Sequence, residues 1–351
     1  MQHGSFLFGA STSAHQVEGG NTNNDWWEYE RTLPPFMRSG KAADHFHLYK
    51  DDIALAASLG HNAHRISLEW SRIEPQEGKF NRAAIEHYRS VLSEIHSHGM
   101  KVFVTLHHVT VPGWFSRQGG WESKRSPELF NRYARYVGQH LRDVVDFWIT
   151  IHEPNVYALQ SYGKGIWPPK KKNLFSVIRV MQNLARAHVR AYRSLQAVSP
   201  RAPVGIAQRV SPGLQSKESF FFHYVFFLLT KRSHDFIGVN YYNNRISIVH
   251  SLLDMKRYKK PIYITSDGIA DETDAMRADF IRSQVRAIEK AQSKGADVRG
   301  YLHWSLLDNF EWADGFAPRF GLVAVDYKTM ERTVRPSAWV YKAIIEQSHR
   351  K

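Results

Sequence analysis

Eight short apolar or β-branched runs recur along the 351 residues, and they alternate with longer amphipathic stretches. A run of four to eight such residues, bounded by turn signals, is typical of a buried strand. We expect strands at residues 6–10, 63–67, 102–106, 147–150, 204–207, 236–239, 262–265 and 301–305. Strands that alternate with helices indicate parallel βαβ units, and eight such units close into a barrel.

Apolar residues at three- and four-residue spacing predict the intervening helices, over residues 83–98, 128–141, 174–198, 276–294 and 337–347. No Pro/Ser-rich linker interrupts this alternation, and no repeat shorter than the strand–helix rhythm is present. We therefore predict an α/β fold, a (β/α)8 TIM barrel that forms one domain over residues 1–351. In such barrels the functional side chains follow the carboxyl ends of the strands.

Composition limits the chemistry and the partners. The chain has no cysteine, which excludes disulfides, thiolate metal sites and a thiol nucleophile. The net charge of +14 is spread along the chain, and its tightest basic runs, 170–172 and 256–260, are predicted loops. We read this charge as solvated surface and expect no nucleic-acid partner.

The N-terminal residues carry neither a basic region nor a long apolar stretch, so we expect no secretory signal and a cytoplasmic protein. Residues 220–229 are the most hydrophobic segment, but a bilayer span takes about 20 apolar residues. We interpret this segment as a buried barrel helix. A membrane-surface or partner-docking helix is the alternative, although we expect no membrane partner.

Polar and aromatic residues follow the predicted strands where a barrel mouth would form. They are Gln16 to Gly19 after the first strand, His107 and His108 after the third, His152 to Pro154 after the fourth, Asn240 to Tyr242 after the sixth, and Asp308 to Trp312 after the eighth. Amide, imidazole and carboxylate groups beside Trp and Tyr suit a pyranose, which offers hydroxyls and flat CH faces. The sequence therefore predicts a sugar pocket and a small carbohydrate ligand.

Three segments of this mouth, residues 148–154, 236–242 and 301–312, resemble the β-glycosidases of glycoside hydrolase family one. Residues 63–75 and 319–322 also match, and the resemblance covers essentially the whole chain in family order. It implies that Glu153 is the general acid/base. It further implies sugar-hydroxyl ligands at Gln16, His108 and Glu311, an aromatic platform at Trp304 and Trp312, and neighbours of the nucleophile at Arg65 and Tyr241.

Some of these residues also have structural interpretations. Trp304 could fill the barrel, and Arg65 could pair with a structural carboxylate. His107, next to His108 but facing the other way, is expected to serve packing.

The sequence departs from the family pattern at the seventh strand. The family's Thr-Glu-Asn-Gly run, whose Glu is the nucleophile, corresponds here to Thr265-Ser266-Asp267-Gly268. A serine hydroxyl lacks the negative charge that stabilises an oxocarbenium-like transition state, and it does not readily form the usual glycosyl ester. We therefore expect the two-step retaining route to be severely impaired.

Further departures cluster at the same mouth. His152 stands where the family has Asn, Val109 where it has Trp, and Asp267 where it has Asn. The loops after strands 5 and 6 also look short, because only residues 209–234 and 243–260 are available for them. We expect open and shallow leaving-group sites as a result.

The sequence leaves three functions open. The first is weak β-glycoside hydrolysis, with Glu153 as proton donor and Asp267 or Glu311 in place of the nucleophile. An inverting route would need two carboxylates about 6.5 to 9.5 Å apart.

The second is a sugar-binding protein without turnover. The third is a metal pocket of His108, His152 and Glu153, although His152 can instead donate a hydrogen bond to a sugar hydroxyl. No cofactor is expected, because Gly163-Lys164-Gly165 lacks the third glycine of a dinucleotide loop. The oligomeric state is left open.

Overall fold

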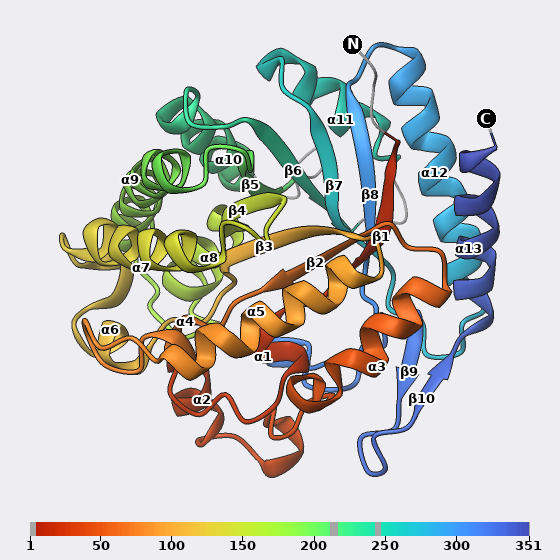
Figure 1. Cartoon of the computed structure of the whole chain (residues 1–351). Coiled ribbons are helices and arrows are strands. Elements are labelled where there is room, and N and C mark those ends of the chain that lie inside the picture. The colour runs from red at the N-terminus through yellow and green to blue at the C-terminus, as the bar shows by residue number, and fades with distance from the viewer. Residues whose placement is uncertain (1–4, 211–216, 243–246, 351) are drawn as a thin grey trace.

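The structure, a computed structural model, describes residues 5–210, 217–242 and 247–350, and for residues 217–223 and 349 only the backbone. Eight parallel strands form a closed barrel in sequence order, with β8 paired back to β1 (Figure 1). The strands are β1 Leu7–Ser11, β2 Ala63–Ser67, β3 Lys101–His107, β4 Phe147–His152, β5 Val204–Arg209, β6 Phe236–Tyr241, β7 Ile262–Asp267 and β8 Val298–Trp304. The predicted (β/α)8 barrel is confirmed.

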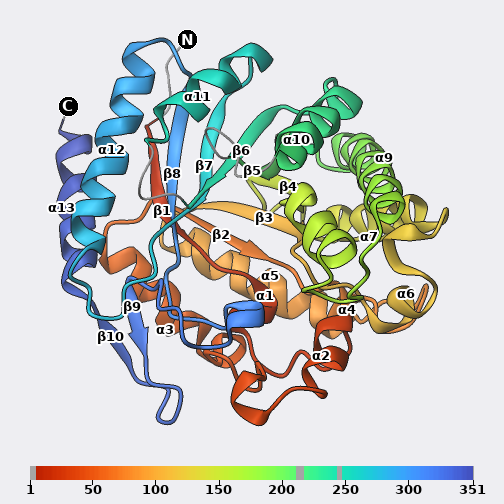
Figure 2. The ribbon, with the colours of Figure 1, turned by 180° about the vertical axis from the view of Figure 1, so that it is seen from behind.

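Helices surround the barrel in an outer layer, as Figures 1 and 2 show from opposite sides. The longer ones are α3 His45–Ser58, α5 Arg82–Ser97, α7 Ser126–Leu141, α9 Leu174–Val198, α10 Lys217–Thr230, α11 Val249–Met255, α12 Arg277–Ser293 and α13 Pro336–His349. Short helices in the loops are α1 Ala14–Val17, α2 Asp25–Glu30, α4 Trp70–Ile73, α6 Gly113–Arg117 and α8 Pro154–Ala158. A small hairpin, β9 Val323–Val325 with β10 Arg332–Val334, precedes α13.

Local sequence explains where several helices begin. The side chains of Asn81 and Asn173 accept hydrogen bonds from the backbone N–H of Ala84 and Ser176, which caps α5 and α9. Both helices then bury one apolar stripe, which for α9 includes Val177 and every third or fourth residue after it. The apolar stripe is the pattern from which these helices were predicted.

Aromatic rings fill the barrel interior at the amino-terminal ends of the strands. Phe103 and Phe147 stack with ring centroids 4.1 Å apart, and Phe236 and Tyr263 pack edge-on or tilted against them. These side chains point inward from the first half of their strands, so they fill the barrel below the level of the polar residues. A separate and larger apolar core lies between the strands and the helices.

Segment 220–229 lies within α10, as expected, but it is not buried along its whole length. Phe226 and Phe227 are buried, whereas the side chains of Leu228 and Leu229 are 66% and 50% exposed. The side chains of residues 220–223 are not described. No helix in the described part of the chain is long and apolar enough to cross a membrane.

The two loops predicted to be short fall partly outside the described residues, which omit 211–216 and 243–246. In the second loop, α11 is followed by a single 3-10 turn, Lys256–Tyr258, within the basic run predicted as a loop. The other basic run, 170–172, does form a loop, and Lys171 pairs there with Glu122.

Candidate active site

A cavity of about 410 Å³ opens at the carboxyl ends of the strands. It falls in the size range of small-molecule sites. Its walls carry the predicted Gln16, His108, His152, Glu153, Trp304, Glu311 and Trp312, together with Val109, Val156, Tyr157, Gln160, Ile166, Trp167, Arg209, Tyr242, Ala313, Asp314 and Phe320. Seven of the predicted site residues thus converge on one pocket.

The β8–β1 side of the cavity is a closed hydrogen-bond network. The Glu311 carboxylate accepts from Trp304 Nε1 at 2.9 Å and from Gln16 Nε2 at 3.3 Å. Gln16 Nε2 also lies 2.9 Å from Asn309 Oδ1, and Ser13 Oγ donates to Gln16 Oε1 at 2.6 Å. Burial raises the pKa of Glu311 to about 7. These groups are fixed in place and retain lone pairs for ligand hydroxyls.

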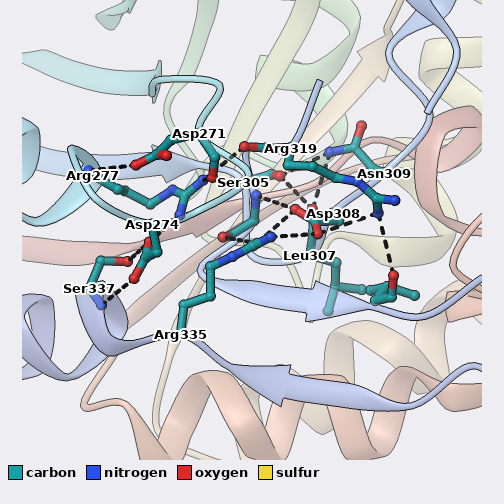
Figure 3. Close-up of polar contacts among 12 residues, drawn as sticks. Asp271, Asp274, Arg277, Ser305, Leu307, Asp308, Asn309, Arg319, Arg335 and Ser337 are labelled. Carbon is teal, nitrogen blue, oxygen red and sulfur yellow. Dashed lines mark hydrogen bonds and ion pairs between the residues drawn. The ribbon is translucent and has the colours of Figure 1, made fainter. Parts of the chain in front are cut away.

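Figure 3 shows what holds this loop in place. Asp308, directly before Asn309, accepts from both Nη1 and Nη2 of Arg335, at 2.8 and 3.0 Å, and from the Gly321 N–H at 2.9 Å. Arg335 directly precedes α13, and Arg319 lies 3.5 Å from the same carboxylate. A bidentate pair of this kind fixes both partners in direction as well as distance. The loop after β8 is therefore tied to the start of the last helix.

A second part of the same network anchors the loop after β7 (Figure 3). Arg277 pairs with Asp274 and donates to the Arg319 carbonyl at 2.8 Å. Asp274 in turn accepts from the Ser337 N–H at 2.8 Å. The loops after β7 and β8 and the start of α13 consequently form one polar cluster.

Two histidines form a stacked pair in the wall. The rings of His108 and His152 lie 3.7 Å apart at an angle of 15°. Burial is the main cause that lowers the pKa of each well below 6.5, and Arg65 contributes in both cases. Both imidazoles are therefore neutral at neutral pH. His107 packs among Trp121 and Tyr157 instead, as expected.

The metal pocket of His108, His152 and Glu153, which the sequence left open as an alternative, is not supported by this geometry. Because the two rings are stacked in nearly parallel planes, their lone pairs do not converge on one point, and His152 Nδ1 already accepts from Arg65 Nη1 at 2.9 Å. Within the described ranges, no group of three His, Asp or Glu side chains is placed to hold a metal ion.

Glu153 follows β4 and faces the cavity. Its Oε1 accepts from Asn240 Nδ2 at 2.9 Å and lies 3.8 Å from His152 Nε2. The Glu153 backbone has a φ of 47°, and Val109 and Trp312, also in the wall, have φ of 71° and 54°. Left-handed backbone at non-glycine residues is uncommon and concentrates at functional sites. These three side chains are thus aimed into the cavity at some cost in backbone energy.

Ser266 is fully buried, and its hydroxyl is hydrogen-bonded to the hydroxyl of Tyr242. Tyr242 lines the cavity, so the Ser266 hydroxyl lies behind the Tyr242 side chain.

The sequence pointed to Tyr241 as the site residue of this motif, whereas the structure places the neighbouring Tyr242 in the cavity wall. Phe236 and Asn240 point into the barrel, and the two-residue period of a strand places Tyr242 on that face. Tyr241 instead belongs to the apolar core between barrel and helices, which corrects its predicted place beside the nucleophile position.

Asp267 is not brought to the cavity. Its carboxyl is fully buried, and burial is the main cause that shifts its pKa, while Tyr301 and Arg209 oppose that shift. Tyr301 packs against Tyr341 of α13, on the helix-facing side of β8. Pairing along β7 becomes irregular between Ile264 and Asp267, which turns Ser266 toward Tyr242 and Asp267 away. The expectation that Asp267 substitutes for the nucleophile is therefore corrected.

Burial raises the pKa of Asp267 well above its usual range. Neither of its oxygens has a hydrogen bond of ordinary geometry among the described residues, although Tyr301 lies close enough to favour the charged form. Asp267 is thus a neutral buried acid at moderate pH.

Arg65 projects from β2 beneath the cavity wall. Its Cζ lies 5.8 Å from the centre of the Trp304 ring, and Nη1 donates to His152. The guanidinium is fully buried, and burial lowers its pKa to about 10, with Tyr242 and Glu153 opposing that shift. The structural carboxylate considered as its partner is not found among the described residues, where Arg65 forms no ion pair.

Arg209 and Trp167 are wall residues that the sequence reading did not single out. Arg209 ends β5, and its Cζ lies 4.6 Å from the centre of the Tyr242 ring. Its position at the carboxyl end of a strand was the signal that could have identified it. Trp167 lies in the long loop before α9, which strand ends alone do not locate.

Comparison with known proteins places this site in a family. Residues 2–220 and 247–350 match "Glycosyl hydrolase family 1". Among curated relatives, Beta-glucosidase 47 of Arabidopsis thaliana is 30% identical, with 97% of this chain and 84% of that protein covered. The chloroplastic galactolipid galactosyltransferase SFR2 of the same plant is 31% identical over 84% of this chain, and the chain spans only 56% of the length of that relative.

Solved structures agree in fold. A beta-glycosidase from Pyrococcus horikoshii superposes with a TM-score of 0.88 at 36% identity, covering 98% of this chain and 94% of that one. A beta-glucosidase from Thermotoga maritima in complex with methoxycarbonyl-substituted glucoimidazole gives 0.90 at 26% identity, covering 98% of each chain. The resemblance noted in the sequence is confirmed, and the chain belongs to glycosyl hydrolase family 1.

Proposed function

We propose that this protein acts on β-glycosides as a weak hydrolase, with Glu153 as the proton donor and Ser266 at the place of the usual carboxylate nucleophile. The observation that carries the proposal is the convergence of a hydrogen-bonded glycone side, Gln16 with Glu311, and the Glu153 carboxyl on one cavity. Such a site orients a pyranose and positions an acid at its leaving oxygen. The ligand is a small carbohydrate, a class that the glucoimidazole complex of the Thermotoga relative supports.

The activity is weak because negative charge is missing where the transition state develops positive charge. Ser266 is neutral and bonded to Tyr242, and Asp267 faces the helix layer. Glu311, a further carboxyl of the wall, is engaged by Trp304 and Gln16. Neither a covalent glycosyl ester nor strong electrostatic stabilisation is available from these groups.

The leaving-group side is proposed to be open and shallow, through short loops after β5 and β6. The alignment with Beta-glucosidase A of Thermotoga maritima runs over 434 positions while this chain has 351 residues, so this chain lacks residues that the relative has, and we assign the missing residues to these two loops. Poor exclusion of water on that side adds to the weak turnover.

The test compares the native protein with Ser266→Glu on aryl β-glucosides and β-galactosides. Restoring a carboxylate beside Arg65 is expected to raise kcat/KM by roughly 100-fold or more, since it supplies both charge and nucleophile. Glu153→Gln in the same background is expected to remove the gain for substrates with poor leaving groups. An unchanged rate in Ser266→Glu would contradict the proposal.

The stereochemistry of the product separates two routes. Proton NMR of the first-formed sugar from native protein would show inversion if water attacks directly, and retention in Ser266→Glu. Hydrolysis by the native protein that is unaffected by Glu153→Gln would exclude Glu153 as the proton donor.

A second candidate is a sugar-binding protein without turnover. The burial of Ser266 behind Tyr242 favours it, because the cavity then presents a glycone site without a second reactive group. Calorimetry with glucose and galactose, combined with hydrolysis at the uncatalysed rate in native protein, would decide for this candidate.

A further inference from the structure

Helix α9 carries charge of one sign on the outside of the barrel. Its 25 residues include Arg179, Arg186, Arg190 and Arg193, and they contain no aspartate or glutamate. All four arginines are exposed. The surfaces of soluble domains usually intersperse both signs of charge. The outer face of α9 is therefore positive, and no acidic residue of the same helix offsets that charge.

The exposed residues of α9 form one row. Phe175, Gln182 and the four arginines follow one another at three- or four-residue intervals, which places them on the same side of the helix. At 1.5 Å per residue, the row from Phe175 to Arg193 is about 27 Å long. A single flat surface can therefore contact the whole α9 row at once.

The fold neutralises little of this charge. Glu122 pairs with Lys171 just before α9 and also acts on Arg179. In the part of the chain that the structure describes, however, no ion pair includes Arg186, Arg190 or Arg193, and Arg186 Nη1 lies 3.5 Å from the neutral side chain of Asn183. The carboxyl half of the α9 row thus keeps its charge for a partner outside this chain.

Large apolar side chains are exposed beside the α9 row. Leu174 and Phe175 in the first turn of α9 are 62% and 81% exposed, and Leu228 and Leu229 in the last turn of α10 are 66% and 50% exposed. The two helices lie side by side in the outer layer (Figures 1 and 2). Exposed apolar groups that gather in this way mark an interaction site.

A groove of about 400 Å³ lies where α9 and α10 meet. It combines three guanidinium groups with apolar side chains, and its described lining includes Arg186, Arg190 and Arg193 with Ala185, Val189 and Leu229. A guanidinium group matches the oxygens of a phosphate, and apolar lining suits a hydrocarbon. The groove therefore suits a phosphate group that is attached to an apolar chain.

We propose that the face formed by the α9 row and the last turn of α10 binds the surface of a membrane that contains anionic phospholipids. The arginines contact lipid phosphates, while Phe175 and Leu228 enter the interface between headgroups and acyl chains. This contact lies outside the cavity and does not depend on the proposed hydrolysis. We expected no membrane partner from the sequence, because its charge was read as solvated surface, and the clustering of that charge beside exposed apolar side chains revises this expectation.

Other partners fit this face less well. An acidic protein or a nucleic acid would match the arginines but would leave the exposed leucines without an apolar partner. A second copy of this chain, packed about a two-fold axis, would bring one α9 row against another, so that like charges would meet. Only an anionic bilayer offers both negative charge and an apolar layer over such a length.

The test measures flotation of the full chain with lipid vesicles. Native protein is expected to bind vesicles of phosphatidylcholine with roughly one third phosphatidylglycerol at least tenfold more tightly than vesicles of phosphatidylcholine alone. Added salt should weaken this binding. The triple variant Arg186→Gln/Arg190→Gln/Arg193→Gln should weaken it by roughly 100-fold, since each arginine near the surface adds to the attraction.

A matched control removes the same charge from another helix. The side chains of Arg282, Arg286 and Lys290 are exposed on α12, which also contains Asp279 and Glu289 and lies on another side of the barrel (Figure 1). The triple variant Arg282→Gln/Arg286→Gln/Lys290→Gln should change vesicle binding by less than about threefold, through net charge alone. Equal losses in the α9 and α12 variants, or no preference of native protein for anionic vesicles, would overturn the proposal.

The apolar part of the contact separates a membrane from other anionic partners. Phe175→Gln/Leu228→Gln keeps every charge and should weaken vesicle binding by roughly fivefold or more. The same variant should bind heparin, an anionic polymer without an apolar layer, as native protein does. Vesicle binding that is unchanged in this variant would assign the face to a polyanion and overturn the membrane contact. Melting temperatures check that all three variants, in which only exposed side chains are replaced, keep the fold.

Discussion

The two sides of the cavity differ in how completely their polar groups are satisfied. On the β8–β1 side, Glu311 is bonded to both Trp304 and Gln16. Beneath the other wall, Arg65 of β2 retains two unpartnered donors, and Asp267 of β7, on the side away from the cavity, carries a buried carboxyl without an ordinary hydrogen bond among the described residues. The barrel thus holds a complete network in the cavity wall and an incomplete set of polar groups behind it.

This difference teaches that the β8–β1 side of the cavity is held by contacts that also hold the fold together, whereas the groups around Arg65 and Ser266 depend on local contacts. The loop after β8 is tied through Asp308 and Arg335 to α13, so its geometry is maintained even if catalysis is lost. A change at position 266 disturbs only local partners. A family member can therefore keep its glycone site while the other side changes.

The largest effect on stability is expected from removing one partner of the Asp308–Arg335 ion pair, which holds the loop on the β8–β1 side. Arg335→Met leaves the Asp308 carboxylate buried, where its side chain is only 1% exposed, and should lower the free energy of unfolding by about 3–5 kcal/mol. Urea unfolding measures this. Arg299→Met, which removes an exposed pair with Asp297, should change stability by less than about 1 kcal/mol. Similar losses of stability in both variants would show that the buried Asp308–Arg335 pair contributes no more than an exposed ion pair.

A substitution at Asp267 is expected to raise the free energy of unfolding, not to lower it. The pKa of Asp267 is raised in the folded protein by burial, while the unfolded chain ionises near 3.8. Above that pH the unfolded state releases a proton that the folded state keeps, so this group lowers stability as pH rises, by at most about 1.4 kcal/mol per pH unit. Asp267→Asn should therefore stabilise the protein by about 1–3 kcal/mol at pH 7.

Unfolding of native protein and Asp267→Asn at several pH values above about 3.8 checks this sign. The gain of the variant should grow with pH. A gain that is constant across the range would mean that Asp267 does not titrate differently in the two states.

A moderate effect is expected on sugar affinity. Gln16→Ala removes an amide that bridges Asn309 and Glu311, and should weaken the binding of glucose by about tenfold, or roughly 1.4 kcal/mol. Calorimetry gives the affinity. The surface variant Gln118→Ala, whose exposed side chain hydrogen-bonds to Glu77 and Arg125, should bind as the native protein does. Equal affinity of both variants would remove Gln16 from the glycone site.

The smallest effect is expected from the dependence of glucose affinity on pH. The pKa of Glu311 is raised to about 7 by burial, so its carboxylate form, the better acceptor for sugar hydroxyls, is gained as pH rises through about 7. Glucose affinity should rise a few-fold over that interval, and Glu311→Gln should flatten the profile. An affinity that falls with rising pH would assign the titration to a different group.

The barrel and most of the pocket were predictable from sequence, because strand periodicity and strand ends alone place side chains at the mouth. Gln16, His108 and Glu311 were found in this way, with the family resemblance assigning their roles. Local patterns of this kind survive into the fold because each depends only on nearby residues.

The expectations for Tyr241 and Asp267 were wrong because the direction of a side chain depends on the register of its strand, which the sequence does not show. Tyr241 and Tyr242 are adjacent in one motif, and only the parity along β6 decides which of them enters the barrel. The irregular pairing in β7 that separates Ser266 from Asp267 has no signature in the sequence. The stacking of His108 on His152 depends on two loops meeting, which no local pattern specifies.

Because aromatic rings close the barrel at the amino-terminal ends of its strands, the pocket opens only between the loops at the other end. Phe103, Phe147, Phe236 and Tyr263 leave no through-route along the barrel axis, so whatever enters between the loops must leave the same way. Any small molecule that binds in the cavity is therefore exchanged through the loop side alone, and one occupant has to leave before another takes its place.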